Sequence, residues 1–281
     1  MKVVLFGAGA TCKQYIENIT PDIEISAIAD NDKNKAGSTL YGHSIISPEK
    51  ICNIYFEKIV LCVNDWNETA IDEICLQLQS LGIPENSIVL HSTRFTDTSP
   101  RVKFLHLIYN KLIDAPGDIA ECGVHIGNFA SHINRIFKNH TLWLFDTFTG
   151  FDRRDLAFES ESSMYFNKKV NNFKTASEKI SLLKCPNRSS ICVRKGYVPD
   201  TFSGLEDKKF KFVNLDMDLY APTIAAMRFF APRMIENGII LIHDYNNIHY
   251  DGVKRAVNEF QSEANFVKIP IVQGGVAVIM K

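Results

Sequence analysis

Two series of alternating strands and helices run along the chain, and each opens with an apolar strand that leads into a glycine turn. The first series starts with Lys2–Phe6 and the turn at residues 7–9, and the second starts with Asp118–Cys122 and Gly123. Strands that alternate with helices pair in parallel, because each helix carries the chain back over a face of the sheet. The sequence therefore predicts two α/β units.

The stretch between the two series separates them into domains. Residues 91–100 (HSTRFTDTSP) are polar and rich in turn-forming residues, which is typical of a linker. We therefore predict a small Rossmann-like domain at 1–92 and a second domain at 101–281. The last two strands, 266–271 and 275–280, leave no room for a helix between them, so they should form an antiparallel hairpin.

The other elements follow from apolar periodicity and turn signals. Further strands are predicted at 25–29, 58–63, 87–90, 141–145, 190–194, 210–215 and 238–242, and helices at 11–19, 68–81, 101–113, 128–137, 221–234 and 253–261. Residues 41–48 are predicted to form a loop, and residues 152–189 a helix-sized insertion into the second domain.

Composition and charge exclude several classes of protein. The 281 residues are 46% apolar and 22% charged, with a net charge of −1, so nothing global favours nucleic acid or an anionic membrane surface. No apolar run approaches the roughly 18 residues of a membrane span, and the apolar start is a strand, not a cleaved signal. The seven cysteines form no Cys-x-x-Cys pair, which predicts free thiols and a cytoplasmic location.

An acidic residue precedes the glycine turn of the second domain. Glu121 is followed by Gly123 and Gly127, and the next strand ends at Asp146. Glycines at such a turn let a ligand approach the backbone, and the two carboxylates suit an ammonium group and a ribose diol. The alternatives are that the glycines serve packing alone and that Asp146 caps its own turn.

Two later strands also end in polar side chains. Asp216 and Asp218 follow one apolar strand, and His243 and Asp244 follow the next. The ends of neighbouring parallel strands lie side by side, so Asp216 and Asp244 could share one cation, with His243 as a third ligand. Oxygen ligands suit Mg²⁺, and a histidine also admits Mn²⁺. The alternative is that the carboxylates are solvated turn residues and that His243 serves packing.

Taken together, residues 118–259 resemble the macrocin-type sugar O-methyltransferases, which methylate deoxysugar hydroxyls. The matching stretches, in the family's order, are GDIAECGVHIGNFA, LWLFDTFTGF, GYVPDTF, FVNLDMDLYAPT, GIILIHDY and GVKRAVNEF. The resemblance implies a class I methyltransferase fold, a parallel sheet closed by an antiparallel hairpin, with S-adenosylmethionine as methyl donor. The family usually has an acidic residue at the position of His243.

The resemblance also implies roles for the candidate residues. Glu121, Gly123, Gly127 and Asp146 fall at the cofactor, Asp216, His243 and Asp244 at a divalent metal, and Asp218 at the general base. A cation that binds a sugar hydroxyl lowers its pKa, and a carboxylate can then take the proton. A chelated pair of hydroxyls would select a vicinal diol.

The insertion is rich in basic residues. Between residues 168 and 195 one acidic residue, Glu178, stands against eight basic ones: Lys168, Lys169, Lys174, Lys179, Lys184, Arg188, Arg194 and Lys195. This bias suggests an anionic acceptor, such as a nucleotide-linked or phosphorylated sugar. A solvated basic face is the alternative. The sequence leaves the oligomeric state open, including a homo-oligomer.

The first domain has an incomplete dinucleotide-binding pattern. Gly7 and Gly9 match a G-x-G-x-x-G turn, but Cys12 stands at the third position, and Asp30 ends the next strand. Nucleotide binding, assembly and ligand-free scaffolding stay open, and we expect scaffolding. An NAD(P)-dependent sugar oxidoreductase or epimerase would need a Tyr-x-x-x-Lys or comparable pair, which this segment lacks. A catalytically silent binding module is the non-enzymatic alternative.

Overall fold

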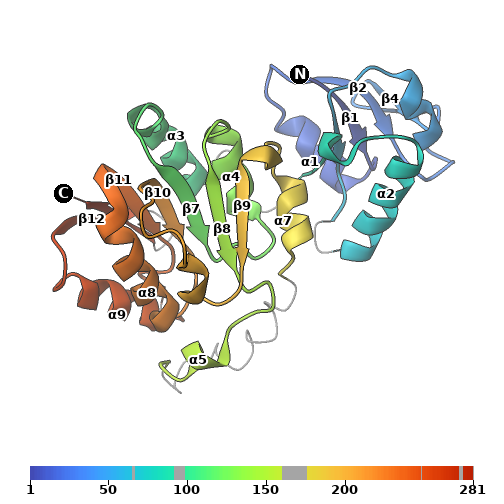
Figure 1. Cartoon of the computed structure of the whole chain (residues 1–281). Coiled ribbons are helices and arrows are strands. Elements are labelled where there is room, and N and C mark those ends of the chain that lie inside the picture. The colour runs from blue at the N-terminus through green and yellow to red at the C-terminus, as the bar shows by residue number, and fades with distance from the viewer. Residues whose placement is uncertain (65–66, 92–98, 160–175, 248, 272–274, 281) are drawn as a thin grey trace. The chain divides into compact units, whose positions relative to one another are not determined.

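A computed structural model of the chain describes residues 1–64, 67–91, 99–159, 176–247, 249–271 and 275–280. The chain divides into two compact units (Figure 1). Unit 1 comprises Met1–Thr96 and Leu182–Pro186, and unit 2 comprises Asp97–Ser181 and Asn187–Lys281. None of the described helices is long and apolar enough to cross a bilayer.

Unit 1 contains a six-stranded sheet in the order β3-β4-β2-β1-β5-β6. Its strands are β1 (Lys2–Phe6), β2 (Glu24–Ala29), β3 (Thr39–Leu40), β4 (His43–Ile46), β5 (Lys58–Leu61) and β6 (Ile88–Leu90). Its helices are α1 (Ala10–Glu17) and α2 (Glu68–Ser80), with 3₁₀ helices η1 (Pro48–Asn53) and η2 (Glu85–Ser87). All strand pairs are parallel except the short pair β3–β4.

The prediction of a loop at 41–48 is wrong. Strand β4 lies inside this range and pairs in parallel with β2, where Ile45 is opposite Ile28. Ile45 is buried in the core of the unit. Tyr41 and Gly42, both with positive φ, make the tight turn from β3 into β4. The adjacent β-branched residues Ile45 and Ile46, between a glycine turn and Pro48, were the signal for this strand.

Unit 2 contains a seven-stranded sheet in the order β12-β13-β11-β10-β7-β8-β9. Its strands are β7 (Asp118–Cys122), β8 (Leu142–Asp146), β9 (Ile191–Lys195), β10 (Phe210–Leu215), β11 (Met234–Ile242), β12 (Phe266–Ile271) and β13 (Gly275–Met280). Strand β13 pairs antiparallel with β11 and with β12, and the other pairs are parallel. The predicted class I methyltransferase order, closed by an antiparallel hairpin, is confirmed.

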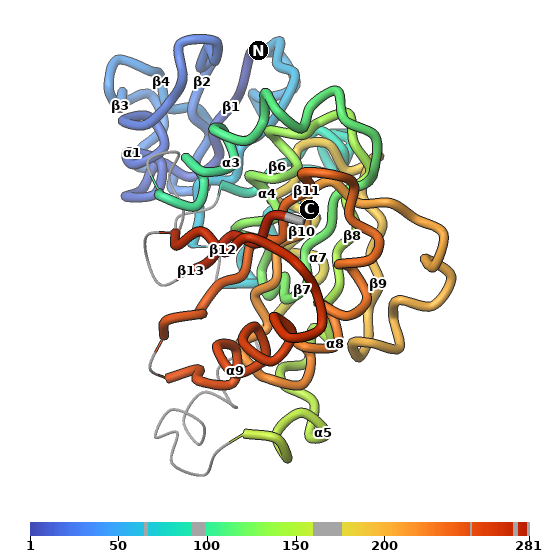
Figure 2. Tube along the Cα trace, turned by 90° about the vertical axis from the view of Figure 1, so that its left-hand side faces the viewer, coloured from blue at the N-terminus to red at the C-terminus, as the bar shows by residue number. Residues whose placement is uncertain are grey.

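The helices of unit 2 cover both faces of this sheet. They are α3 (Pro100–Leu112), α4 (Asn128–Ile136), α5 (Arg153–Leu156), α8 (Tyr220–Phe230) and α9 (Asp251–Phe260), with 3₁₀ helices η4 (Arg188–Ser190), η5 (Asp200–Phe202) and η6 (Ala231–Arg233). Helix α7 (Glu178–Lys184) begins in unit 2, and its last three residues belong to unit 1. Helices α8 and α9 run side by side (Figure 2). Both helices pack on one face of the sheet, and Val213 of β10 belongs to the hydrophobic core that they form with it. On the opposite face, Phe212 stacks on Phe137, just beyond α4.

The predicted helix at 221–234 is too long. Helix α8 ends at Phe230, a 3₁₀ turn containing Pro232 follows, and β11 already begins at Met234. Proline has no amide hydrogen for a helix interior and its ring crowds the preceding turn. The rings of Phe145, Phe202 and Phe210 pack edge-on around Phe230 and hold this end of the helix in the core.

Strand β10 holds helix α3 at both ends. The buried Lys211 Nζ donates to the carbonyl oxygens of Ile113 and Ala115, at 3.2 and 2.8 Å, just beyond the end of the helix. Arg101, near its beginning, contacts Asn214 and Asp216 at the other end of the strand. The helix therefore lies antiparallel to β10, with its first turn at the carboxyl edge of the sheet.

At that edge the backbones come very close. Leu215 pairs with Cys122 on one side and with Ile242 on the other, so the residues that follow these strands are neighbours. Gly123 has φ +85°, and a Cβ there would collide with the carbonyl oxygen of Asp216. Only glycine fits this position.

The substitution Gly123→Ala should therefore lower the free energy of unfolding by roughly 3 kcal/mol or more, from overpacking and a strained φ. Urea unfolding measures the loss. Gly9→Ala is the matched control, since Gly9 also lies in a strand-to-helix turn but has φ −104° and no atom within 4 Å of an added Cβ. Equal stability of the two variants would contradict this account of the turn.

Candidate functional site

Four polar side chains meet where β10 and β11 end. They are Asp216, Asp218, His243 and Asp244, and their potential ligand atoms all lie within 4.8 Å of one another. Asp218 and Asp244 have left-handed backbones, with φ +63° and +58°. Aspartate tolerates this conformation better than most residues, and such backbones are frequent at functional sites. The two strand ends thus bring together the four residues that the sequence singled out here.

His243 lies between two carboxylates. Its Nδ1 is 2.6 Å from Asp244 Oδ2 and 2.9 Å from Asp216 Oδ1. The side chain of Asn247 donates to the other oxygen of Asp244 at 2.6 Å. Burial lowers the pKa of His243, but the charge of Asp216 and the two hydrogen bonds outweigh it and raise this pKa to about 10. The imidazolium form compensates part of the local negative charge.

Asp216 and Asp218 have opposite protonation tendencies. Burial raises the pKa of Asp216, but the charges of His243 and Arg101 and their hydrogen bonds hold it well below its usual range. Burial also raises the pKa of Asp218, and there a hydrogen bond to Asp244 and the charge of Asp216 add to the effect. The two carboxyl groups of Asp218 and Asp244 thus share a hydrogen bond, which favours the protonated form of Asp218.

Arg101 is the member of this site that sequence reasoning missed. It is 3% exposed, and its guanidinium donates to Asp216 Oδ2 at 3.0 Å and to Asn214 Oδ1 at 3.1 Å. The guanidinium also lies over the ring of Phe129, 4.2 Å from its centre. A single arginine beside a linker forms no sequence motif that indicates a functional site. Its one signal was its position in the predicted helix at 101–113, at the start of the second domain.

Glu121 lies at the end of β7, beside Asn214. It is 1% exposed, and Asn214 Nδ2 donates to its Oε1 at 2.9 Å. Among the described residues its Oε2 has no hydrogen-bond partner. Burial raises the pKa of Glu121 to about 8, Arg101 opposes this shift and Asp216 adds to it. A buried carboxylate oxygen without a donor is costly, and a ligand's ammonium group would satisfy it.

Asp146 at the end of β8 organises the glycine turn. Its Oδ2 accepts from the amides of Val124 and His125, both at 2.7 Å, and its Oδ1 accepts from the amide of Phe148 at 2.7 Å. Gly127 has φ +71° and begins α4, packed against Ser181. The carboxylate of Asp146 therefore serves the turn, and an ionised carboxylate has lone pairs for further donors.

In unit 1, Asp30 accepts hydrogen bonds from backbone amides in the way that Asp146 does in unit 2. Asp30 Oδ2 accepts from the amide of Ala8 at 2.6 Å and from Lys35 Nζ at 3.0 Å, and its Oδ1 accepts from the amide of Asp32 at 2.8 Å. Cys12, at the third position of the glycine pattern, is buried in the core. The carboxylate that a dinucleotide ribose would need is thus engaged by three donors within its own unit.

The insertion is described only in part. Lys168, Lys169 and Lys174 lie outside the described residues, and Lys184 is completely buried, so it does not contribute to a solvated basic face. Before the gap, Glu159 Oε1 accepts from the amide of Tyr220 at 2.6 Å, at the start of α8 and two residues after Asp218. The beginning of the insertion is thereby fixed beside the polar cluster.

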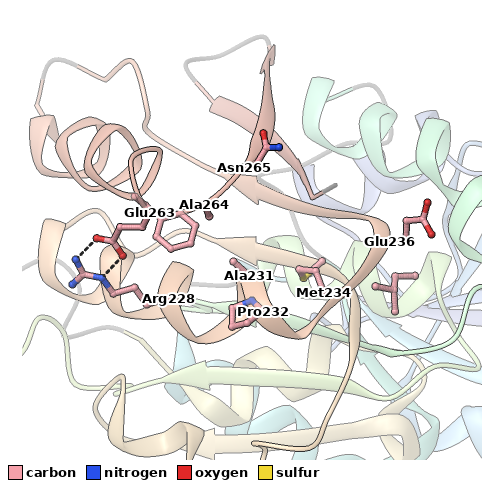
Figure 3. Close-up of a pocket in the computed structure, with 10 residues that line it drawn as sticks. Arg228, Ala231, Pro232, Met234, Glu236, Glu263, Ala264 and Asn265 are labelled. Carbon is pink, nitrogen blue, oxygen red and sulfur yellow. Dashed lines mark hydrogen bonds and ion pairs between the residues drawn. The ribbon is translucent and has the colours of Figure 1, made fainter.

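A groove of about 800 Å³ lies at the opposite edge of the sheet (Figure 3). Its lining is Arg228, Ala231, Pro232, Met234, Ile235, Glu236, Phe260, Glu263, Ala264 and Asn265. It lies where β11 begins, whereas the polar cluster follows its end. Arg228 is paired with Glu263, which also lines the groove, and with Glu259. None of the predicted site residues lines it.

Comparisons with known proteins match both units. A family described as "C2185-like, N-terminal" matches residues 1–89, and one described as "Macrocin-O-methyltransferase (TylF)" matches residues 98–278. The O-methyltransferase NovP shares 21% sequence identity with a TM-score of 0.55, covering 65% of this chain and 80% of NovP. The calicheamicin methyltransferase CalS11 shares 17% identity with a TM-score of 0.49, covering 76% of this chain and 92% of CalS11. No curated protein sequence matches the chain.

The buried carboxyl of Glu121 should make stability depend on pH. In the unfolded chain it ionises near pH 4.3, whereas burial raises its pKa to about 8 in the folded protein, so its contribution falls as pH rises between these values. Glu121→Gln keeps the contact with Asn214 and cannot ionise. It should therefore be more stable than wild type by a margin that grows over this range to about 5 kcal/mol at most at pH 8.

Thermal unfolding at several pH values measures this margin. Glu236→Gln is the control, because Glu236 is exposed, and it should show no margin that grows with pH. A Glu121→Gln protein whose stability follows that of wild type from pH 5 to pH 8 would contradict the raised pKa.

Proposed function

The chain belongs to the macrocin O-methyltransferase (TylF) family, whose model matches residues 98–278, and from this premise we propose that it transfers a methyl group from S-adenosylmethionine to a sugar hydroxyl with the help of a divalent cation. The observation that carries the proposal is the cluster of Asp216, Asp218, His243 and Asp244. It lies at the same edge of the sheet as Glu121 and Gly123, one strand away. A sugar acceptor is what the family's chemistry suggests for this chain.

The glycine turn fits the methyl donor. Glu121 Oε2 is a buried acceptor at the end of β7 that suits an ammonium group, and Gly123 lets the turn after this strand pass close to the backbone of Asp216. Asp146 would bind the ribose hydroxyls through the lone pairs that its three amide donors leave over. S-adenosylmethionine, when bound, supplies a methyl group on a sulfonium sulfur that a hydroxyl oxygen can attack.

The polar cluster fits a divalent cation. Asp216 and Asp244 offer carboxylate oxygens and His243 offers a ring nitrogen, a mixed set that suits Mn²⁺ as well as Mg²⁺. His243 has to lose a proton to serve as a ligand. A divalent cation, when bound, lowers the pKa of a hydroxyl beside it and of the neighbouring carboxyls.

The protein's own groups would then divide the work. Asp218, once ionised, accepts the proton of the attacking hydroxyl. Its position is fixed by the left-handed backbone and by the helix α8 that follows two residues later. Asp216 and Asp244 orient the acceptor, and Glu121 and Asp146 orient the donor, so positioning supplies much of the rate.

The proposal also covers the domains, the cellular location and the charge of the acceptor. We assign residues 1–92 and 101–281 to separate domains, and the first to a scaffolding role, because Cys12 stands at the third position of its glycine pattern and is buried in the core. The seven free thiols fit a reducing compartment such as the cytoplasm. An anionic acceptor rests on the basic bias of residues 168–195 in the sequence, and two of these residues do not add to it, since Lys184 is buried and Lys195 is paired with Glu178 at 3.9 Å.

Binding of S-adenosylhomocysteine and of Mn²⁺ tests the proposal directly. Titration calorimetry should show S-adenosylhomocysteine binding with roughly micromolar affinity, and Mn²⁺ binding that Asp216→Ala abolishes while S-adenosylhomocysteine still binds. Asp207→Ala, at an exposed carboxylate, is the control and should bind both ligands as wild type does. Folded wild-type protein that takes up neither ligand would overturn the proposal and favour the silent binding module.

His243 should set the choice of metal. Nitrogen ligands favour Mn²⁺ over Mg²⁺, so His243→Asp should shift the ratio of the two dissociation constants toward Mg²⁺, by about tenfold. Competition titrations of both ions against wild type and variant measure this ratio. An unchanged ratio would mean that His243 supports the site without ligating the ion.

A further inference from the structure

Two carboxylates of the proposed site are joined by a chain of buried side chains. Arg101 contacts Asp216 Oδ2 at 3.0 Å and Asn214 Oδ1 at 3.1 Å, and Asn214 Nδ2 contacts Glu121 Oε1 at 2.9 Å. Asn214 is completely buried. Asp216 belongs to the proposed metal site and Glu121 to the proposed cofactor site, so this chain connects the two.

Each carboxylate has one oxygen in the chain and one oxygen directed elsewhere. Asp216 gives Oδ2 to Arg101, while its Oδ1 lies 2.9 Å from His243 in the polar cluster. Glu121 gives Oε1 to Asn214, while its Oε2 has no partner among the described residues. The chain therefore leaves one oxygen of each carboxylate for a ligand and fixes the plane of both groups.

The direction of the hydrogen bonds leaves no second arrangement. The guanidinium only donates, so Asn214 has to turn its oxygen toward Arg101 and its amino group toward Glu121. The two nitrogens of a planar guanidinium reach two acceptors in a fixed geometry, which a lysine ammonium cannot reproduce. The ring of Phe129 holds the guanidinium from a third side.

We propose that Arg101 is a positioning residue that, through Asn214, orients Glu121 for the methyl donor and Asp216 for the metal at once. This inference rests on the proposed function and adds to it a residue outside both ligand sets. It gives helix α3 a role in the reaction, since Arg101 lies in its first turn and Lys211 fixes its end. The helix presents Arg101 from a position locked at both ends.

Arg101→Lys tests the proposal with the charge retained. Loss of the forked contact should weaken both the binding of Mn²⁺ and the binding of S-adenosylhomocysteine about tenfold or more, as is typical when a partner of a metal ligand is removed. Calorimetry with each ligand alone measures both constants. Lys103→Gln removes an exposed charge from the same helix and should change neither constant.

Asn214→Ser provides the second test. Serine cannot span Arg101 and Glu121, while the contact between Arg101 and Asp216 stays. This variant should therefore weaken S-adenosylhomocysteine about tenfold and leave Mn²⁺ binding near that of wild type. A purely structural role for the chain would instead reduce the melting temperature and leave the two constants of the folded protein unchanged.

The outcomes separate the two proposals. If Arg101→Lys and Asn214→Ser bind both ligands as wild type does, Arg101 has no positioning role and the proposed function stands. If Asn214→Ser weakens Mn²⁺ as much as S-adenosylhomocysteine, the division of the two carboxylates is wrong. If wild type binds neither ligand, the proposed function itself fails.

Discussion

Carboxylates buried side by side cost free energy unless positive charge or hydrogen bonds compensate them. Unit 2 places three buried carboxyl groups, Glu121, Asp218 and Asp244, and the partly buried Asp216 at one edge of its sheet. Each is compensated differently. His243 and Arg101 hold the pKa of Asp216 low, Asp218 shares a hydrogen bond with Asp244, and Glu121 accepts one hydrogen bond from Asn214. Helix α3 supplies Arg101 and strand β10 supplies Asn214 as partners of these carboxyl groups. The carboxylate oxygens that gather at this edge favour the binding of a cation.

The backbone at this edge of the sheet is also tightly constrained. Gly123 is required because the end of β7 touches the carbonyl oxygen of Asp216, and Asp218 and Asp244 have left-handed conformations directly after their strands. Helix α3 is fastened to β10 by Lys211 at one end and by Arg101 at the other. A strained, tightly fastened edge of this kind costs stability locally, and the large aromatic core around Phe230 compensates for it elsewhere.

Sequence reasoning went furthest where local patterns were strong. The two series of strands and helices, the closing hairpin and the family were all predicted, since each rests on periodicity or on motifs in a fixed order. The errors came where an element was very short or where an apolar pattern continued past the end of a helix. Strand β4 was taken for a loop because it has only four residues, and α8 was extended through Pro232 because the apolar pattern continues beyond it.

The sequence by itself determined the succession of strands and helices along the chain and the chemical groups at the strand ends, because both rest on local patterns. It also identified Asp216, Asp218, His243 and Asp244 as candidates, although their roles stay predictions. Only the tertiary structure decided which charges face one another. Arg101 is 115 residues from Asp216 along the chain, and Asn214 and Glu121 meet only through the register of β7 with β10. Contacts between residues so far apart depend on packing and strand register, and no local pattern in the sequence records them.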